Sequence, residues 1–307
     1  MNELNQIIET YLKHCKVVKE LNLKTIKAYR IDLTQFQSKI DYFNKITDKA
    51  LLNEYISLIH QKYQPRTTKR KIASIKAFYR YLEVEELIQE NPFNKINVKF
   101  REPIELPRVI PSHIIETFIN TMYKQRTLAK TKYQQLYILR DIAVIELLFA
   151  TGLRISELCT LTPSQIDLIA DNLLIYGKGS KERMIQIGNP DVKKILVEYR
   201  KAFEHDIQSS GWFFINRLHK RFSEQSVREM IVKYINLAAI EMHITPHMFR
   251  HSFASLLLDA DVDTRHIQKM LGHSSIVTTE RYTHVSMAKQ HTILTTKHPR
   301  NSMHIEV

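Results

Sequence analysis

The segment IAVIELLFATGLRISELCTL, residues 142–161, decides the fold of the second half of the chain. Residues 142–150 are almost all apolar, which predicts a buried helix in a run too short to span a bilayer. Thr151-Gly152 then predicts a turn, and a second helix is expected to start near Arg154. Arg154 would therefore lie at a helix N-terminus, where amide donors and the helix dipole favour an anion. Taken alone, an arginine in such a turn is more often an ordinary surface residue.

A β-hairpin is predicted next, in DNLLIYGKGSKERMIQIG, residues 171–188. Residues 173–176 and 184–187 are strand-like, and GKGSKE forms the turn between them. Lys178 is expected near the tip, between two glycines. The GKG does not belong to a Walker phosphate loop, because the G-x-x-x-x-G-K-[ST] pattern is absent and no helix follows, so an ATPase is not expected.

The segment TPHMFRHSFASLLL, residues 245–258, opens with a Thr-Pro helix start. His247 and Arg250 are three residues apart and share one helical face. His247 and His251 are four apart, a spacing that can bind zinc. A zincin-like H-E-x-x-H site would need a glutamate at Met248, and no third ligand has a matching spacing, so no metal site is expected.

The first half of the chain is predicted to be helical. All six glycines follow residue 151, and apolar residues recur at helical spacing in residues 25–40 and 67–83. The second of these segments also carries a basic stripe: Arg66, Lys69, Lys76 and Arg80. Such a stripe is usually only a solvated face, but a DNA-facing surface fits the charge of the chain. Proline-rich residues 98–110 predict an extended linker between a domain at 1–97 and a second at 111–307.

Composition favours a polyanionic partner. The 307 residues are 44% hydrophobic and 25% charged, as in a globular protein, and the formal net charge is +13. Nucleic acid is the favoured partner, an anionic membrane surface is less so, and a basic protein without such a partner stays open. Two cysteines give no disulfide framework, and the N-terminal residues do not form a signal peptide. A cytoplasmic protein is expected.

Together the singled-out residues could serve attack on a phosphodiester. Its non-bridging oxygens need forked cations, for which Arg154 and Arg250 are suited. The reaction also needs a nucleophile, an acceptor for its proton and an acid for the departing alkoxide. The stretch HSSIVTTERYTHV, residues 273–285, offers Tyr282 as the nucleophile, with His247 as acceptor and Lys178 as acid.

The chain resembles tyrosine recombinases of the phage-integrase family, and most closely their Xer-type members. The resemblance lies in ATGLRISEL, GKGSKER, HMFRHSFA, LGHSS and TTERYTHV, which match the family's first-arginine, hairpin-lysine, H-x-x-R, second-histidine and tyrosine boxes. The order and intervals also fit, including the nine residues from His273 to Tyr282. NPF followed by LPRVIP resembles the family's linker. The resemblance covers essentially the whole chain, and no catalytic position departs from the pattern.

The resemblance implies a role for each matching residue. Arg154 and Arg250 would clamp the scissile phosphate, and His273 would hydrogen-bond it. Lys178 would protonate the leaving 5′-oxygen, His247 would accept the tyrosine proton, and Tyr282 would form a 3′-phosphotyrosine link. Glu157 would orient the catalytic groups without contacting the phosphate itself. No ATP, metal or other cofactor is required, because the covalent link conserves the phosphodiester's energy.

The resemblance also implies a fold and partners. The fold is mainly α, with an N-terminal helical, SAM-like core-binding domain and a mostly α catalytic domain that contains a small antiparallel sheet. The two would close around DNA as a C-shaped clamp. The implied partner is double-stranded DNA with paired inverted half-sites, held by a homo- or hetero-tetramer on two duplexes. A second recombinase or an activator protein could take part, and the tail 286–307 would dock on a neighbouring subunit.

Several alternatives stay open at the level of sequence. Chromosome-dimer resolution suits a compact chain of this kind, yet small integrases of mobile elements share the architecture. A type IB topoisomerase-like enzyme would use the same chemistry, and a DNA-binding protein without catalysis would need only part of it. The target DNA sequence is not encoded in phosphate contacts.

Overall fold

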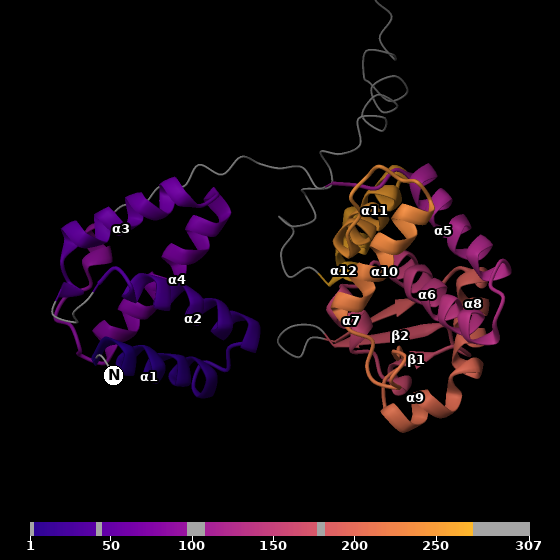
Figure 1. Ribbon diagram of the computed structural model, residues 1–307, viewed down its shortest axis with the longest axis horizontal. Coiled ribbons are helices and arrows are strands. Elements are labelled where there is room, and N and C mark those ends of the chain that lie inside the picture. The colour runs from indigo at the N-terminus through magenta and orange to yellow at the C-terminus, as the bar shows by residue number, and fades with distance from the viewer. Residues whose placement is uncertain (1–2, 41–44, 97–107, 177–181, 273–307) are drawn as a thin grey trace, which may run out of the picture. The chain divides into compact units, whose positions relative to one another are not determined.

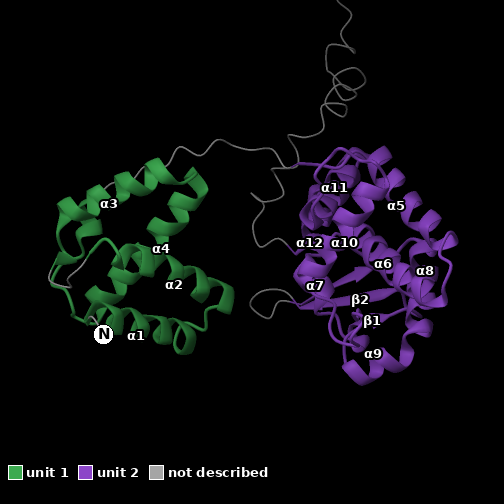
Figure 2. Cartoon of the chain, in the orientation of Figure 1, with its two compact units in different colours: residues 1–104 green, residues 105–307 purple. Residues whose placement is uncertain are grey.

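The computed structural model describes residues 3–40, 45–96, 108–176 and 182–272, which form two compact units, 1–104 and 105–307 (Figure 2). Lys178, His273, Tyr282 and the tail 286–307 lie outside the described residues. Among the described residues, no helix is both long enough and apolar enough to cross a bilayer.

The first unit contains four α-helices and a short 3-10 turn in its described part (Figure 1). These are α1 (Glu3–Val17), α2 (Leu23–Gln37), α3 (Lys49–Lys62), α4 (Pro65–Val84) and η2 (Pro92–Lys95). Local sequence explains several of the boundaries. Asn22 and Asp48 cap α2 and α3 by accepting hydrogen bonds from backbone N–H groups, and Pro65 occupies the first turn of α4, where no amide donor is needed. The two helices predicted at 25–40 and 67–83 are thus confirmed, with small shifts at their ends.

The core of the first unit combines apolar packing with one buried ionic cluster. The apolar positions predicted for α4 (Ile72, Ile75, Tyr79 and Leu82) are all buried. Asp32 of α2 is fully buried and pairs with Arg70 and Lys71 of α4, while the Ser74 hydroxyl donates to it at 2.8 Å. A buried carboxylate is costly without partners, and these three partners of Asp32 link α2 to α4.

The second unit contains eight α-helices, one 3-10 turn and three strands among its described residues (Figure 1). The helices are α5 (Ser112–Thr127), α6 (Lys132–Thr151), α7 (Ile155–Cys159), α8 (Pro190–Ala202), α9 (Glu204–Ser210), α10 (Glu224–Leu237), α11 (Pro246–Asp259) and α12 (Thr264–Leu271), with η3 at Pro163–Gln165. The strands are β1 (Ile166–Asp167), β2 (Asn172–Tyr176) and β3 (Glu182–Gln186).

The strands form one antiparallel sheet in the order β1-β2-β3. Leu173 pairs with Ile185 and Ile175 with Arg183, so the predicted hairpin is confirmed. Leu173, Ile175 and Ile185 are buried, which identifies the face of the sheet that packs on the helices. A mostly helical chain with a small antiparallel sheet is the expected fold class.

Helix α6 is the centre of the second unit. It packs against α5, α8 and α11, and most of its residues from Leu139 onward are buried, as predicted for the apolar run. The helix ends at Gly152, whose φ of +60° is left-handed, and whose N–H donates to the carbonyl of Leu148. This glycine cap turns the chain sharply, so that Arg154 follows at the start of α7.

Candidate active site

Arg154 is the residue that directly precedes α7, and Glu157 of that helix holds it in place. The backbone N–H of Arg154 donates to Oε2 of Glu157 at 2.9 Å, and its Nη1 donates to Oε1 at 2.8 Å. The arginine side chain is 38% exposed, and no other hydrogen bond or ion pair is made by its guanidinium within the part of the chain that the structure describes. Its Nε and Nη2 donors are therefore available to an anion at this helix N-terminus.

Glu157 is the hub of this corner of the site. Only 8% of its side chain is exposed, and it also pairs with Arg183 of β3, whose Nη1 and Nη2 donate at 3.1 and 2.7 Å. Burial by itself raises the pKa of Glu157. The hydrogen bonds from Arg183 and from the Arg154 backbone N–H outweigh that effect, so the pKa lies below its usual range. Glu157 is therefore ionised at neutral pH.

Arg250 of α11 is 4% exposed and connects two helix ends. Its Nη1 donates to the carbonyl of Gly152 and its Nη2 to the carbonyl of Leu271, both at 2.7 Å. These carbonyls belong to the ends of α6 and α12, whose oxygens lack helical partners. Arg250 thus joins the turn that precedes Arg154 to the residues that precede His273 in the sequence.

His247 lies one turn before Arg250 on α11 and is exposed at the surface. Desolvation of the imidazole by the surrounding protein lowers the pKa of His247. The positive charges of Arg250, Arg228 and Arg154 lower this pKa further. An imidazole with a lowered pKa is neutral at neutral pH and can accept a proton. Arg250 binds the carbonyl of Gly152, two residues before Arg154, and His247 lies one turn before Arg250 on α11, so the structure brings these three predicted residues to one region.

His251 follows on the same helix and is partly buried. Burial lowers its pKa to about 4, with smaller contributions from His247 and Arg250. In the described ranges, no three His, Cys, Asp or Glu side chains gather in a way that could hold a metal.

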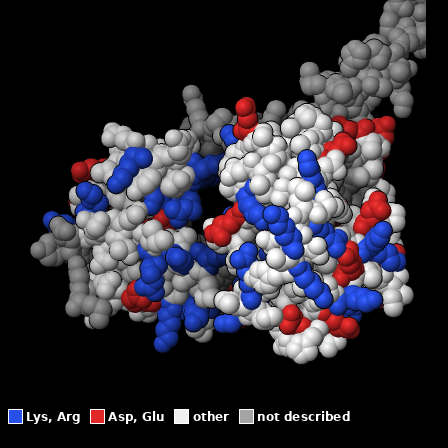
Figure 3. Space-filling view, turned by 45° about the vertical axis from the view of Figure 1, so that its right-hand side comes forward, with Lys and Arg blue, Asp and Glu red and all other residues white. Residues whose placement is uncertain are grey.

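The predicted basic stripe is exposed on α4. Arg66, Lys69, Lys76 and Arg80 all lie at the surface of the first unit, as the helical spacing requires. The space-filling view shows many lysine and arginine side chains on the face that it presents, with fewer acidic ones between them (Figure 3). Their contact with DNA is a prediction that nothing in the structure tests.

Arg183 is the site residue that the residue-by-residue sequence analysis missed. It belongs to the GKGSKER segment, in which Lys178 was singled out. The sequence could have indicated Arg183, because in an alternating strand it falls on the same face as Ile185 and Ile187, which are buried. A charged residue at an inward-facing strand position calls for a buried partner.

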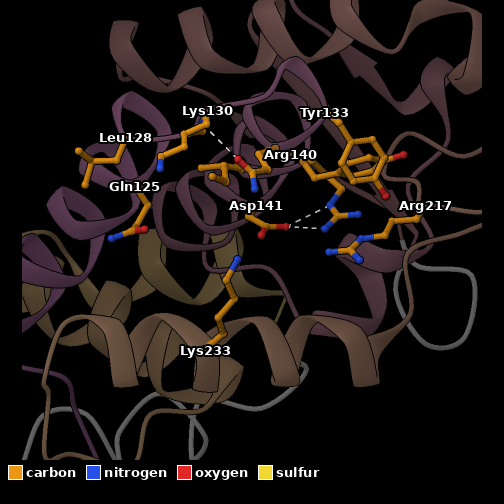
Figure 4. A pocket seen from close by; sticks show the side chains of 12 residues that line it. Gln125, Leu128, Lys130, Tyr133, Arg140, Asp141, Arg217 and Lys233 are labelled. Carbon is orange, nitrogen blue, oxygen red and sulfur yellow. Dashed lines mark hydrogen bonds and ion pairs between the residues drawn. The ribbon is translucent and has the colours of Figure 1, made fainter.

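A separate hollow of about 380 Å³ lies near the N-terminal half of α6 (Figure 4). Its lining includes Arg140, Asp141, Tyr133, Arg217 and Lys233. Arg140 and Asp141 in this lining form an ion pair, in which Nε and Nη2 of Arg140 donate to Oδ1 of Asp141 at 3.1 and 2.6 Å. Arg140 lies about 18 Å before Gly152 along the helix axis, so the hollow is distinct from the site around Arg154.

Comparison with known proteins places the chain in a family. The model of the "Phage integrase family" matches residues 118–289, and that of the "Phage integrase, N-terminal SAM-like domain" matches residues 8–86. The chain belongs to the phage integrase family. A tyrosine recombinase of Agathobacter rectalis is 54% identical over 305 residues, covering 99% of this chain and 100% of that protein.

More distant tyrosine recombinases share the same organisation. Tyrosine recombinase XerC of Pediococcus pentosaceus is 32% identical, covering 92% of this chain and 95% of its own length. A solved structure with a similar fold is that of the XerH site-specific recombinase bound to palindromic difH substrate, a post-cleavage complex. The match covers 94% of this chain and 83% of the XerH chain, with a TM-score of 0.73 and 21% sequence identity. The expected fold and enzyme class are therefore confirmed: this is a tyrosine recombinase with a helical SAM-like first unit.

Proposed function

We propose that this recombinase cuts and rejoins DNA site-specifically through a 3′-phosphotyrosine intermediate at Tyr282. The observation that carries the proposal is the clustering of Arg154, Arg250 and His247 around the end of α6. Two arginines and a neutral imidazole in one region supply the cations and the proton acceptor that attack on a phosphodiester requires. The roles of Lys178, His273 and Tyr282 rest on the sequence boxes, because these residues lie outside the described ranges.

The proposed cleavage step is a transesterification at phosphorus. The Tyr282 hydroxyl oxygen forms a bond to the scissile phosphorus as the bond to the 5′-oxygen breaks, and the phenol proton passes to His247. Lys178 donates a proton to the departing 5′-oxygen. Rejoining is the reverse attack by a 5′-hydroxyl on the phosphotyrosine, so no ATP or metal enters the balance.

Arg154 and Arg250 would stabilise the charge that builds on the non-bridging oxygens. Glu157 keeps the Arg154 guanidinium at the start of α7, so little reorganisation is needed when a phosphate arrives. The lowered pKa of His247 supports its role as proton acceptor, because the ring is neutral at physiological pH. His273 would donate a further hydrogen bond to the phosphate.

The proposed partner is double-stranded DNA with paired inverted half-sites. The two units would close on it as a clamp, the first through the stripe of Arg66, Lys69, Lys76 and Arg80, and the net charge of +13 supports a polyanionic partner. Four subunits, alike or of two kinds, would join two duplexes, with the tail 286–307 of each docked on its neighbour. An activator protein could regulate that assembly in the cytoplasm.

Chromosome-dimer resolution is the biological role that we propose, supported by the XerC-type relatives. Excision or integration of a mobile element is the second candidate, and mapping the crossover sites separates the two. A plasmid with two directly repeated sites tests the reaction class. A site-specific recombinase deletes the intervening segment, whereas a type IB topoisomerase relaxes supercoils in any plasmid, and a non-catalytic DNA-binding protein does neither.

A further inference from the structure

Arg183 of β3 contacts two parts of the site, α7 and α12, that are distant from it in sequence. Its two terminal nitrogens fork onto Glu157 of α7, and its Nε donates to the carbonyl of Met270 near the end of α12 at 3.0 Å. Its side chain is 9% exposed. All three nitrogens of the guanidinium are thus engaged, and the strand, α7 and α12 meet at one buried side chain.

The end of α12 leaves room for the Arg183 side chain because residue 272 is a glycine. Gly272 has a φ of +64°, and a Cβ at that position would lie 2.9 Å from Cδ of Arg183 and 3.1 Å from its Nη1. A glycine here therefore allows the Arg183 side chain to pass against the end of α12. A side chain at residue 272 would therefore displace the Arg183 side chain from the end of α12.

The charges also favour a role beyond packing. Glu157 accepts from both arginines: Oε1 from each Nη1, and Oε2 from the Arg154 backbone N–H and Nη2 of Arg183. Without Arg183, the single negative charge of Glu157 would be balanced by Arg154 alone. With Arg183 present, the trio keeps one net positive charge, which leaves Arg154 effective toward an anion.

We propose that Arg183 is a positioning residue that acts through Glu157: it holds the carboxylate against α12 and offsets its charge, so that Arg154 meets the scissile phosphate in one fixed place. The proposal rests on the proposed function, since it assumes that Arg154 binds that phosphate. Arg183 itself does not contact DNA at the reacting centre.

The test measures the single-turnover rate at which saturating protein forms a covalent adduct on a nicked suicide duplex. Arg183→Gln should slow this rate about 10–100-fold, the range expected from a misplacement of up to about 1 Å. The matched control is Arg126→Gln, which removes the Arg126–Glu198 ion pair elsewhere in the same unit. That variant should keep the wild-type rate, and both should bind an uncut duplex as wild type does.

A double-variant cycle separates positioning from general support of the fold. If Arg183 acts through Glu157, then Glu157→Gln, Arg183→Gln and the double variant should be slowed by similar factors, within about 3-fold. Factors that multiply in the double variant would overturn the proposal. Arg183→Lys keeps the charge without the fork, and its rate should lie between that of wild type and that of Arg183→Gln.

Two further outcomes are distinguishable in the same assay. If Arg183→Gln and Arg126→Gln both react at the wild-type rate while Tyr282→Phe is inert, the positioning role is wrong and the proposed function stands. If Tyr282→Phe forms the adduct, the proposed function fails independently of Arg183.

Discussion

Gly152→Ala should disturb both the stability of the second unit and the catalytic cluster. Gly152 has a φ of +60°, and a Cβ placed on it would lie 2.6 Å from Cδ1 of Phe253 and 2.9 Å from Cδ2 of Leu271. Its carbonyl accepts the hydrogen bond from Nη1 of Arg250 at 2.7 Å. Any shift that relieves the clash therefore moves an acceptor of Arg250.

The free-energy cost has two components, which one control variant separates. A left-handed conformation costs a residue with a Cβ about 1–2 kcal/mol, and overpacking a buried site adds about 1–3 kcal/mol. The expected loss in the free energy of unfolding is thus about 2–5 kcal/mol. Gly211 provides the control, since its φ is +72° and nothing lies within 4 Å of a Cβ there. Gly211→Ala should carry only the first component, about 1–2 kcal/mol.

Urea unfolding followed by fluorescence measures both variants, because the single tryptophan, Trp212, belongs to the second unit. Adduct formation on the nicked duplex should slow about 10–100-fold in Gly152→Ala and stay near wild type in Gly211→Ala. Equal losses of stability in the two variants would refute the role assigned to Phe253 and Leu271. A wild-type cleavage rate in a folded Gly152→Ala protein would refute the link to Arg250.

Three other predictions concern buried charge, pH and the acid. Asp32→Ala should destabilise the first unit by about 3–5 kcal/mol, because Lys71 stays buried without its partner. Glu90→Ala breaks an exposed ion pair and should cost under about 1 kcal/mol. Urea unfolding of both variants measures these losses, and equal losses would contradict the prediction. Burial lowers the pKa of His251 to about 4, so its contribution to stability is complete above about pH 6.5 and is lost as the pH falls toward 4. The full shift would correspond to about 3 kcal/mol, and solvent around the partly exposed ring reduces this to about 2 kcal/mol. His251→Gln should flatten the measured pH dependence of stability by that amount, and an unchanged slope would count against the assignment. Lys178→Ala should cleave about 10²–10⁴-fold more slowly and regain most of its rate on a 5′-phosphorothiolate, whose sulfur leaves without a proton; no recovery would mean that Lys178 is not the acid.

The sequence predicted the parts of the fold that depend on local pattern. The apolar period of α4, the alternation of the hairpin strands and the Thr-Gly turn after α6 each follow from one short segment. Arg154 was expected at a helix start for the same reason. These features could be read directly, because the residues that determine them are neighbours in the chain.

The links between distant segments could not be read in this way. Arg183 reaches Glu157 across 26 positions and Met270 across 87, and Arg250 reaches Gly152 across 98. The sequence placed Arg250 on one helical face with His247 and said nothing of its long-range contacts. The structure shows it buried, with both terminal nitrogens on backbone carbonyls. Long-range hydrogen bonds of this kind depend on how the helices pack, and no local pattern specifies them.

The central claim is that Tyr282 is the nucleophile, and a covalent trap tests it most directly. Wild-type protein incubated with a nicked duplex that carries its crossover site should give a protein–DNA species that survives SDS and is removed by protease. Tyr282→Phe should bind the same duplex with wild-type affinity and give no such species, because a phenyl ring lacks the attacking oxygen. An SDS-resistant adduct formed by Tyr282→Phe would contradict the account and place the nucleophile on another residue.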